Sequence, residues 1–189
     1  MPLTQDIRYS YDDLLSWPEN ERYELFDGFP VALASPSVLH QSVIGELFAQ
    51  FHDFLRGKPC KAFVSPVDVR LFESDGDRPA DVDTVLVPDL VVCCDSGKID
   101  RRGIHGAPDL VVEVLSDSTK RYDLHTKRRL YELAGVREYW LVDPERYSVQ
   151  VFTLSEGKYG PAAAYMALSS VPVGILPGCV IDLGTVFEE

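Results

Sequence analysis

The sequence predicts an α/β sandwich built around a mixed β-sheet. Two short segments, residues 89–94 and 110–115, are almost wholly apolar, which is typical of strands that are covered on both faces. A helical pattern of apolar residues comes before this pair, and a second one, over residues 123–134, comes after it. Another buried strand follows at residues 138–143. A hairpin, a helix, three strands, a helix and a strand in this order indicate helices layered on a sheet.

The N-terminal segment predicts a short helix and a hairpin. Residues 9–17 have an acidic helical pattern that Pro18 ends. The run ERYELFDGFPVALASP, residues 21–36, is typical of two strands, which Asp27 and Gly28 join by a tight turn.

The first core helix follows Ser37 and stops at Gly57. Its apolar residues recur at helical spacing and mark a buried face: Leu39, Val43, Ile44, Leu47, Phe48, Phe51 and Phe54. We expect the next element, residues 61–71, to be a strand.

The second half continues the α/β pattern. Gly135 lies where the second helix should end, and a further strand is expected at residues 148–154. The tail, PVGILPGCVIDLGTVFEE, predicts a strand, a turn and a short helix. We therefore expect one domain over residues 1–189 in three parts: an N-terminal helix and hairpin (1–36), the core (37–143), and C-terminal strands and tail (144–189).

The composition favours an ordinary globular protein of the cytoplasm, with 46% hydrophobic and 25% charged residues. No apolar run reaches the roughly 18 residues of a membrane span, so we expect no membrane partner. The polar, acidic N-terminus is no secretory signal. The four cysteines lack metal-ligand spacing, and we expect the adjacent Cys93 and Cys94 to be small buried apolar residues.

The charge is negative overall but unevenly placed. The net charge of −12 argues against a protein that coats nucleic acid through charge alone. Residues 98–137 nevertheless hold nine of the 18 Lys and Arg residues against six of the 30 Asp and Glu residues. This segment is either a solvated helix face or the basic border of a site.

An acidic residue lies where the sheet should be most deeply buried. Glu113 lies inside the apolar run VVEVL, and an isolated ionised carboxylate is costly to bury. It needs a cation, a proton or a metal; a buried salt bridge or an edge position is the alternative. Asp89 opens the neighbouring strand, and two converging carboxylates would repel each other unless a cation lay between them. Paired oxygen ligands suit Mg²⁺ or Mn²⁺.

The second helix places a lysine on its buried side. At about 100° per residue, four apolar residues lie within roughly 60° of Lys127: Leu124, Leu130, Tyr131 and Ala134. A buried lysine needs an anionic partner, and Glu113 lies on the preceding strand; the alternative is that the Lys127 stem reaches out to water. A cluster of Asp89, Glu113 and Lys127 would suit phosphodiester hydrolysis, with the metal activating water and the ammonium stabilising developing charge.

The motifs around this cluster resemble those of a known family. They are VPDLVVCCD, GAPDLVVEVLSDSTKRYDLHTKRRLYELAGVREYWLVDP, ERYELFDG, His40 and the LPG of the tail. Together they resemble the restriction-endonuclease family known as Uma-two, formerly a domain of unknown function, in the PD-(D/E)xK superfamily. The resemblance covers most of the chain and implies a restriction-endonuclease-like core of helix, three strands, helix and strand. It also implies Mg²⁺-dependent nuclease chemistry, with Asp89 as the PD aspartate and Glu113 as the second acid.

One position departs from the superfamily pattern. The pattern has a lysine two residues after the second acid, where this chain has Leu115. The resemblance suggests that the lysine role has moved to Lys127, which the helical spacing selects independently. The alternative is a catalytically inactive nuclease-fold module that binds DNA or protein, as Leu115 and the net charge favour.

Two further residues are candidates for the site. The resemblance makes His40 a neighbour of the metal and Glu24 a third acid; the alternatives are a hydrogen-bonded core histidine and a solvent-facing strand residue. Asp109 shares a strand face with Glu113 but lies about 13 Å away at strand rise, too far to share an ion. We therefore expect Asp109 to cap or begin its strand.

These features together predict a metal-dependent endonuclease that hydrolyses DNA phosphodiester bonds. The basic segment would receive the DNA backbone, while the acidic remainder keeps non-specific affinity low. We expect a homodimer by analogy with enzymes that cut both strands, although no sequence feature specifies one. A phosphoesterase for a small substrate is a third option.

Overall fold

The computed structural model describes residues 7–18, 21–116 and 122–188. Its main sheet has seven strands, in the order β12-β11-β10-β9-β6-β3, with β13 also paired to β11. β9 and β10 are parallel, whereas β6 is antiparallel to both β3 and β9. The strands of this sheet are β3 (Lys61–Val64), β6 (Leu90–Cys93), β9 (Leu110–Val114), β10 (Glu138–Asp143), β11 (Ser148–Ser155), β12 (Lys158–Tyr159) and β13 (Ala163–Met166).

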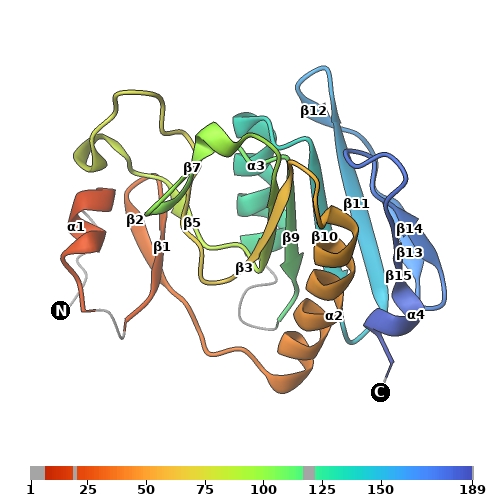
Figure 1. The fold of residues 1–189 in the computed structure, drawn as a ribbon. Coiled ribbons are helices and arrows are strands. Elements are labelled where there is room, and N and C mark those ends of the chain that lie inside the picture. Colours follow the sequence, from red (N-terminus) through yellow and green to blue (C-terminus); the bar gives the residue numbers. More distant parts are fainter. Residues whose placement is uncertain (1–6, 19–20, 117–121, 189) are drawn as a thin grey trace.

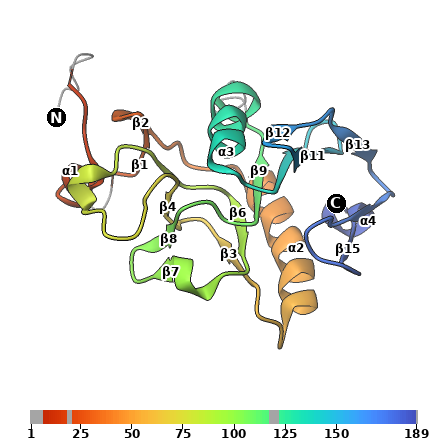
Figure 2. The same ribbon diagram turned by 90° about the horizontal axis from the view of Figure 1, so that it is seen from above.

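Helical segments lie on both faces of this sheet (Figure 2). On one face lies α2 (Val38–Leu55), which Ser37 caps through its side chain. On the other face a π-helical turn, η3 (Tyr122–Lys127), leads into α3 (Arg128–Ala134), which ends at Gly135 in the left-handed conformation. The order α2-β3-β6-β9-α3-β10 is the expected order of helix, three strands, helix and strand.

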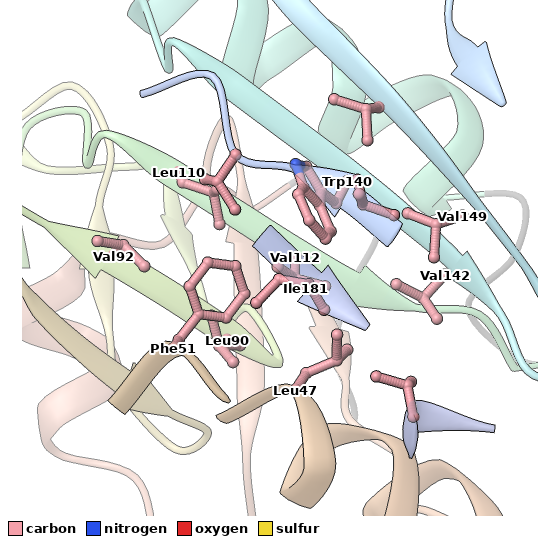
Figure 3. Packing of buried hydrophobic residues seen from close by; sticks show 14 of the residues in the cluster. Leu47, Phe51, Leu90, Val92, Leu110, Val112, Trp140, Val142, Val149 and Ile181 are labelled. Carbon is pink, nitrogen blue, oxygen red and sulfur yellow. The ribbon is translucent and has the colours of Figure 1, made fainter. Parts of the chain in front are cut away.

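Alternate strand residues fill two separate cores. One set, Leu90, Val112 and Trp140, packs with Leu47 and Phe51 of α2, as Figure 3 shows. The other set, Val91, Val111, Tyr139 and Leu141, packs with Tyr131 of α3. This period of two explains why the strands are apolar throughout, since both of their faces are covered. Glu113 lies two residues after Val111, so it belongs to the face that α3 covers.

A second, six-stranded sheet packs against the α3 side of the main sheet. Its order is β2-β1-β5-β4-β8-β7. The strands are β1 (Tyr23–Phe26), β2 (Phe29–Ala32), β4 (Val69–Arg70), β5 (Val85–Leu86), β7 (Ile99–Asp100) and β8 (Gly103–His105). Figure 1 shows β1, β2 and the short helix α1 (Tyr11–Leu15) at the opposite end of the molecule from the C-terminal elements.

The remaining elements are short. They are β14 (Ser170–Pro172) and β15 (Val180–Asp182), which pair with each other, the helix α4 (Leu183–Val186), and two single 3-10 turns, η1 (Pro79–Asp81) and η2 (Ser96–Lys98). Within the ranges that the structure describes, no helix is both long and apolar enough to cross a bilayer.

The local predictions were right for the hairpin and partly wrong for the strand after α2. Asp27 and Gly28 both have positive φ, as the tight turn between β1 and β2 requires. The single strand expected over residues 61–71 is instead two strands, β3 and β4, which belong to different sheets. The chain changes sheets at a cis Ser65–Pro66 peptide bond. A proline in an apolar run marks such a break, since it cannot donate to a central ladder.

The expectation for the adjacent cysteines was wrong for one of them. Cys93 is buried and free, but Cys94 forms a disulfide with Cys60. The β3–β6 register pairs Lys61 with Cys93, so one further step sets Cys60 opposite Cys94. Only this register, and no spacing in the sequence, brings the two cysteines together.

Gly103 is expected to be the glycine that tolerates substitution least. Its φ is +120°, and an added Cβ would lie 2.2 Å from the backbone oxygen of Asp68. We expect Gly103→Ala to lower the free energy of unfolding by about 2–4 kcal/mol, measured by urea denaturation. The control is Gly57→Ala, which also has positive φ but open space around it; we expect a cost of only about 1–2 kcal/mol there. Equal losses at both positions would contradict the clash.

Candidate active site

Glu113 is a buried acid near the end of the central strand β9. Its side chain is about 2% exposed, and its strand is flanked by β6 on one side and β10 on the other. The strand period points Glu113 toward α3 rather than toward α2. A carboxylate so placed requires compensating charge, as the sequence suggests.

Asp89 lies directly across from Glu113 on the neighbouring strand. The β6–β9 register pairs Leu90 with Val112, so one step further sets Asp89 opposite Glu113. The Val114 amide donates a hydrogen bond of 2.7 Å to Asp89 Oδ2, which fixes the carboxylate at this end of the sheet. The two acids that the sequence singles out therefore meet in space.

Lys127 bridges two carboxylates. Its Nζ atom lies 3.0 Å from Glu113 Oε1 and 2.9 Å from Glu24 Oε1, and all three side chains are about 3% exposed. The predicted pairing of Lys127 with Glu113 is therefore present. The Lys127 ammonium thus compensates both buried carboxylates, and removing one partner of a buried ion pair is strongly destabilising.

Glu24 reaches the cluster from the second sheet. It lies on β1, and its Oε1 atom also accepts a hydrogen bond of 2.9 Å from the Val87 amide, just after β5. Glu24 is thus a buried residue of this cluster, and the solvent-facing alternative was wrong. The second sheet closes the site from the side opposite α2.

His40 lies near the start of α2 and contacts Asp89. Its Nε2 atom is 3.3 Å from Asp89 Oδ2 and 2.9 Å from the Val114 carbonyl oxygen. A carbonyl oxygen only accepts hydrogen bonds, so Nε2 carries a proton and donates it. The imidazole therefore contacts both Asp89 and Val114, the two residues that the hydrogen bond from the Val114 amide also joins.

Tyr131 makes a contact that the sequence does not predict. It was expected to pack, and it does, but its hydroxyl also donates a hydrogen bond of 2.8 Å to Glu113 Oε1. Burial, together with the nearby carboxylates of Glu113 and Glu24, raises the pKa of Tyr131 well above its usual range. The available signal was the spacing of four residues between Lys127 and Tyr131, which places both on one side of a helix.

The acids and the lysine line one cleft. The cleft has a volume of about 380 Å³, and its walls include Asp89, Glu113, Lys127 and His40. Arg22 also lines it, two residues before Glu24 in the extended N-terminal segment. Sequence reasoning missed Arg22, although a residue two positions along a strand shares its face. A small group entering this cleft meets two carboxylates and two cationic side chains.

The donor set fits a divalent cation of the magnesium type. Asp89 and Glu113 offer carboxylate oxygens from cross-strand positions, and hard cations prefer oxygen ligands. Among the residues that the structure describes, no three His, Cys, Asp or Glu side chains gather closely enough to hold a metal by themselves. Mg²⁺ commonly binds one or two carboxylates and keeps water or substrate phosphate at its other positions, so two carboxylates are compatible with it.

Two residues near the site have no part in it. Leu115, in the position of the superfamily lysine, is buried in the core that α3 covers. Asp109 lies at the other end of β9, where it accepts a hydrogen bond from the Cys94 amide and pairs with Arg137. Asp109 is therefore a capping residue, as expected.

Tyr131→Phe is expected to cost stability without dismantling the ion cluster. The change removes one buried hydrogen bond to Glu113 and keeps the ring packed against Tyr139. We expect the free energy of unfolding to fall by about 1–3 kcal/mol, since a charged acceptor is left short of one donor. Tyr159→Phe is the matched control, because its hydroxyl donates to a neutral carbonyl, that of Val136. A larger loss in the control would show that the Glu113 contact contributes little.

The fold and the site together define a nuclease-like α/β protein of the restriction-endonuclease type. A crystal structure described as "a putative nuclease belonging to DUF820", from Anabaena variabilis ATCC 29413, superposes with a TM-score of 0.74. The alignment covers 94% of this chain and 97% of that one at 19% sequence identity. The predicted fold class is thereby confirmed.

The chain belongs to the Uma2 family, described as "Putative restriction endonuclease", whose model matches residues 11–184. A curated relative, the uncharacterized protein slr1290 of Synechocystis sp. (strain ATCC 27184 / PCC 6803 / Kazusa), is 28% identical over 148 residues. That match covers 77% of this chain and 74% of the relative. The family that the sequence motifs resemble is therefore confirmed, while the roles of the individual site residues stay predictions.

Proposed function

We propose that this protein is a metal-dependent endonuclease that hydrolyses DNA phosphodiester bonds in the cytoplasm. One observation carries the proposal: Asp89 and Glu113 lie opposite each other in the cleft, with the Lys127 ammonium held at 3.0 Å from Glu113. Membership of a family described as a restriction endonuclease supports the same reaction class. Two acids and a lysine that line one cleft suit phosphodiester hydrolysis.

Each residue has a distinct role in this proposal. Asp89 and Glu113 would hold Mg²⁺ or Mn²⁺, which when bound supplies a Lewis acid for the phosphate and a more acidic water. Lys127 places positive charge where negative charge develops on the phosphate, in a site shielded from bulk water. Lys127 also fixes the Glu113 carboxylate in one orientation.

Glu24, His40 and Tyr131 are positioning residues in the same proposal. Glu24 holds the Lys127 ammonium from the side opposite Glu113. His40 bonds the Val114 carbonyl and contacts Asp89, so it restricts the Asp89 carboxylate. Tyr131 does the same for Glu113. Such supporting contacts commonly change metal affinity or activity by about 10–100-fold when they are removed.

Cleavage of supercoiled plasmid tests the assignment. We expect nicking or linearisation with Mg²⁺ or Mn²⁺ and none with EDTA, and we expect Glu113→Gln to reduce the rate at least about 100-fold. Glutamine matches glutamate in size, and Lys127 keeps its partner Glu24. Asp109→Asn is the matched control, since Asp109 lies on the same strand outside the cleft. Undiminished cleavage by Glu113→Gln would exclude this site as the source of the activity.

A second function is a nuclease-fold module that binds DNA or protein without cutting. The burial of Leu115 in the position of the superfamily lysine favours it, and so does the net charge of −12. Titration calorimetry with Mn²⁺ separates the two functions. A metal-competent site gives binding heat and raises the melting temperature, whereas the module gives neither at millimolar Mn²⁺.

The homodimer expected for a double-strand cutter is a separate proposal. Two antiparallel strands need two centres or two successive events, and a two-fold dimer supplies both centres at once. Sedimentation equilibrium with and without DNA tests it: a mass of 21.1 kDa without DNA, and of one chain per DNA molecule with it, would contradict the dimer.

A further inference from the structure

The active cleft opens into a longer groove. The cleft shares Arg22 and Val87 with a hollow beside α1, and that hollow shares Pro66 and Asp68 with one at the β7–β8 hairpin. A fourth hollow shares Phe63 and Ile99 with the third and extends to the end of α2: His52, Leu55, Arg56, Gly57 and Cys60. Because each hollow shares wall residues with the next, we treat the four together as one groove that runs from the cleft past β3 to the end of α2.

The groove is the basic exception on an acidic protein. The three outer hollows carry five basic side chains, of which Arg22 also borders the cleft, against three acidic ones: Arg22, Arg56, Lys61, Arg101 and Arg102 against Glu21, Asp68 and Asp100. The chain as a whole has a net charge of −12. A local excess of positive charge on such a protein concentrates an anionic partner at one place.

The acids of the groove are already engaged by the protein. Asp68 accepts a hydrogen bond of 2.7 Å from the Tyr11 hydroxyl, Asp100 pairs with the buried Arg70, and Glu21 accepts from a tyrosine hydroxyl, that of Tyr23. Four of the cations are exposed, and no ion pair in the described part of the chain involves them: Arg22, Lys61, Arg101 and Arg102. The groove therefore presents four cations without an ion-pair partner in the described part of the chain, whereas each of its three carboxylates has a hydrogen-bond or ion-pair partner.

The floor of the groove is apolar and partly aromatic. Phe63 and Trp17 line it, together with Pro66 and Val67. Trp17 is held edge-on between two tyrosine rings, with centroid distances of 5.1 Å and 4.8 Å, and is only partly buried. Cations beside flat apolar surfaces suit unpaired bases and their backbone, since every base has an apolar face that stacks.

We propose that this groove binds a single strand of nucleic acid that leads into or out of the active cleft. The proposal rests on the endonuclease function and adds the substrate form: DNA with an unpaired segment next to the scissile bond. A concave path with an apolar floor favours one strand over an intact duplex, whose bases are stacked and turned inward. The phosphates of that strand meet Arg101, Arg102 and Lys61 at the outer end and Arg22 beside the cleft.

Fluorescence anisotropy in EDTA measures this binding without any cleavage. The probes are a labelled 12-nucleotide single strand and a blunt 12-base-pair duplex. We expect the wild-type protein to bind the single strand more tightly, and the double variant Arg101→Ala/Arg102→Ala to bind it roughly tenfold more weakly. The slope of log affinity against log salt should fall by about 1.4, since each phosphate contact on a single strand contributes about 0.7.

Two further variants complete the test. Arg146→Ala/Lys158→Ala removes the same charge near the opposite edge of the main sheet, in the turn before β11 and on β12, and should leave affinity within twofold. Arg22→Ala/Lys61→Ala changes exposed residues elsewhere in the groove and should repeat the loss, which guards against a folding defect in the first variant. Binding should also quench the fluorescence of Trp17, one of two tryptophans, and Trp17→Phe should abolish this signal because Trp140 is fully buried.

Three results would contradict the proposal that the groove binds a single strand. They are an affinity within twofold of wild type in both groove variants, an equal loss in the control, or a blunt duplex bound as tightly as the single strand. The binding experiment and the cleavage experiment test the two proposals separately. If Glu113-dependent cleavage persists while the groove variants bind normally, only the groove is excluded; if the groove binds and nothing is cut, only the endonuclease is excluded.

Discussion

Replacing Lys127 with methionine is expected to cost about 3–5 kcal/mol of unfolding free energy, the largest loss we expect from any single change in the site. The substitution keeps the length of the side chain and removes the Lys127 ammonium that contacts both Glu24 and Glu113, each about 3% exposed. Both buried carboxylates then lose this cationic partner. Urea denaturation followed by circular dichroism measures the loss, and cleavage should fall at least about 100-fold in the same protein.

A second change distinguishes charge repulsion from lost packing. Glu24→Gln in the Lys127→Met background removes one of the two buried carboxylate charges, so we expect it to restore part of the stability but none of the cleavage. Lys158→Met is the matched control, because Lys158 forms an exposed pair with Glu132, and such pairs contribute at most about 1 kcal/mol. If the free energy of unfolding of Lys127→Met lies within about 1 kcal/mol of the wild-type value, the buried ion cluster does not stabilise this part of the fold.

Replacing Asp89 with asparagine should separate metal binding from stability. The amide oxygen of asparagine can still accept the 2.7 Å hydrogen bond from the Val114 amide, so the fold should hold. The anionic ligand is lost, however, and we expect the affinity for Mn²⁺ to fall at least about tenfold and the cleavage rate at least about 100-fold. Titration calorimetry measures the affinity, and thermal denaturation without metal measures the fold.

The comparison variant for Asp89 is Asp109→Asn. Both aspartates follow a proline at the start of an apolar strand and accept a backbone hydrogen bond, but only Asp89 lines the cleft. We expect Asp109→Asn to bind Mn²⁺ as the wild type does. Equal weakening by the two changes would mean that Mn²⁺ binds outside the cleft.

The sequence predicted the core of the fold because its signals are local. Both apolar strands, α2 and the hairpin turn at Asp27–Gly28 follow from periodicity and turn chemistry within a few residues. The second sheet was largely missed, since β4, β5, β7 and β8 are two or three residues long and carry too little pattern. Their pairing is set by contacts across sheets that no short window contains.

Sequence reasoning predicted those residues of the candidate site that place a charge among apolar neighbours. Glu113 and Lys127 stand out because a charge on a buried face demands a partner. Glu24 drew attention only through family resemblance, since its burial depends on β5 and on the Val87 amide, far along the chain. Tyr131 escaped because an aromatic residue on a helix face usually only packs. The π-helical turn that ends at Lys127 is likewise invisible to a pattern based on 100° per residue.

The most direct test is the location of Mn²⁺ in crystals soaked at millimolar concentration, read from anomalous scattering. If Asp89 and Glu113 form the metal centre of a nuclease, an anomalous peak should lie between their carboxylates in the wild-type protein and be absent from Asp89→Asn. A peak elsewhere, or a cleft without one while plasmid cleavage in solution requires Mn²⁺, would contradict the assignment of the active site to these two residues.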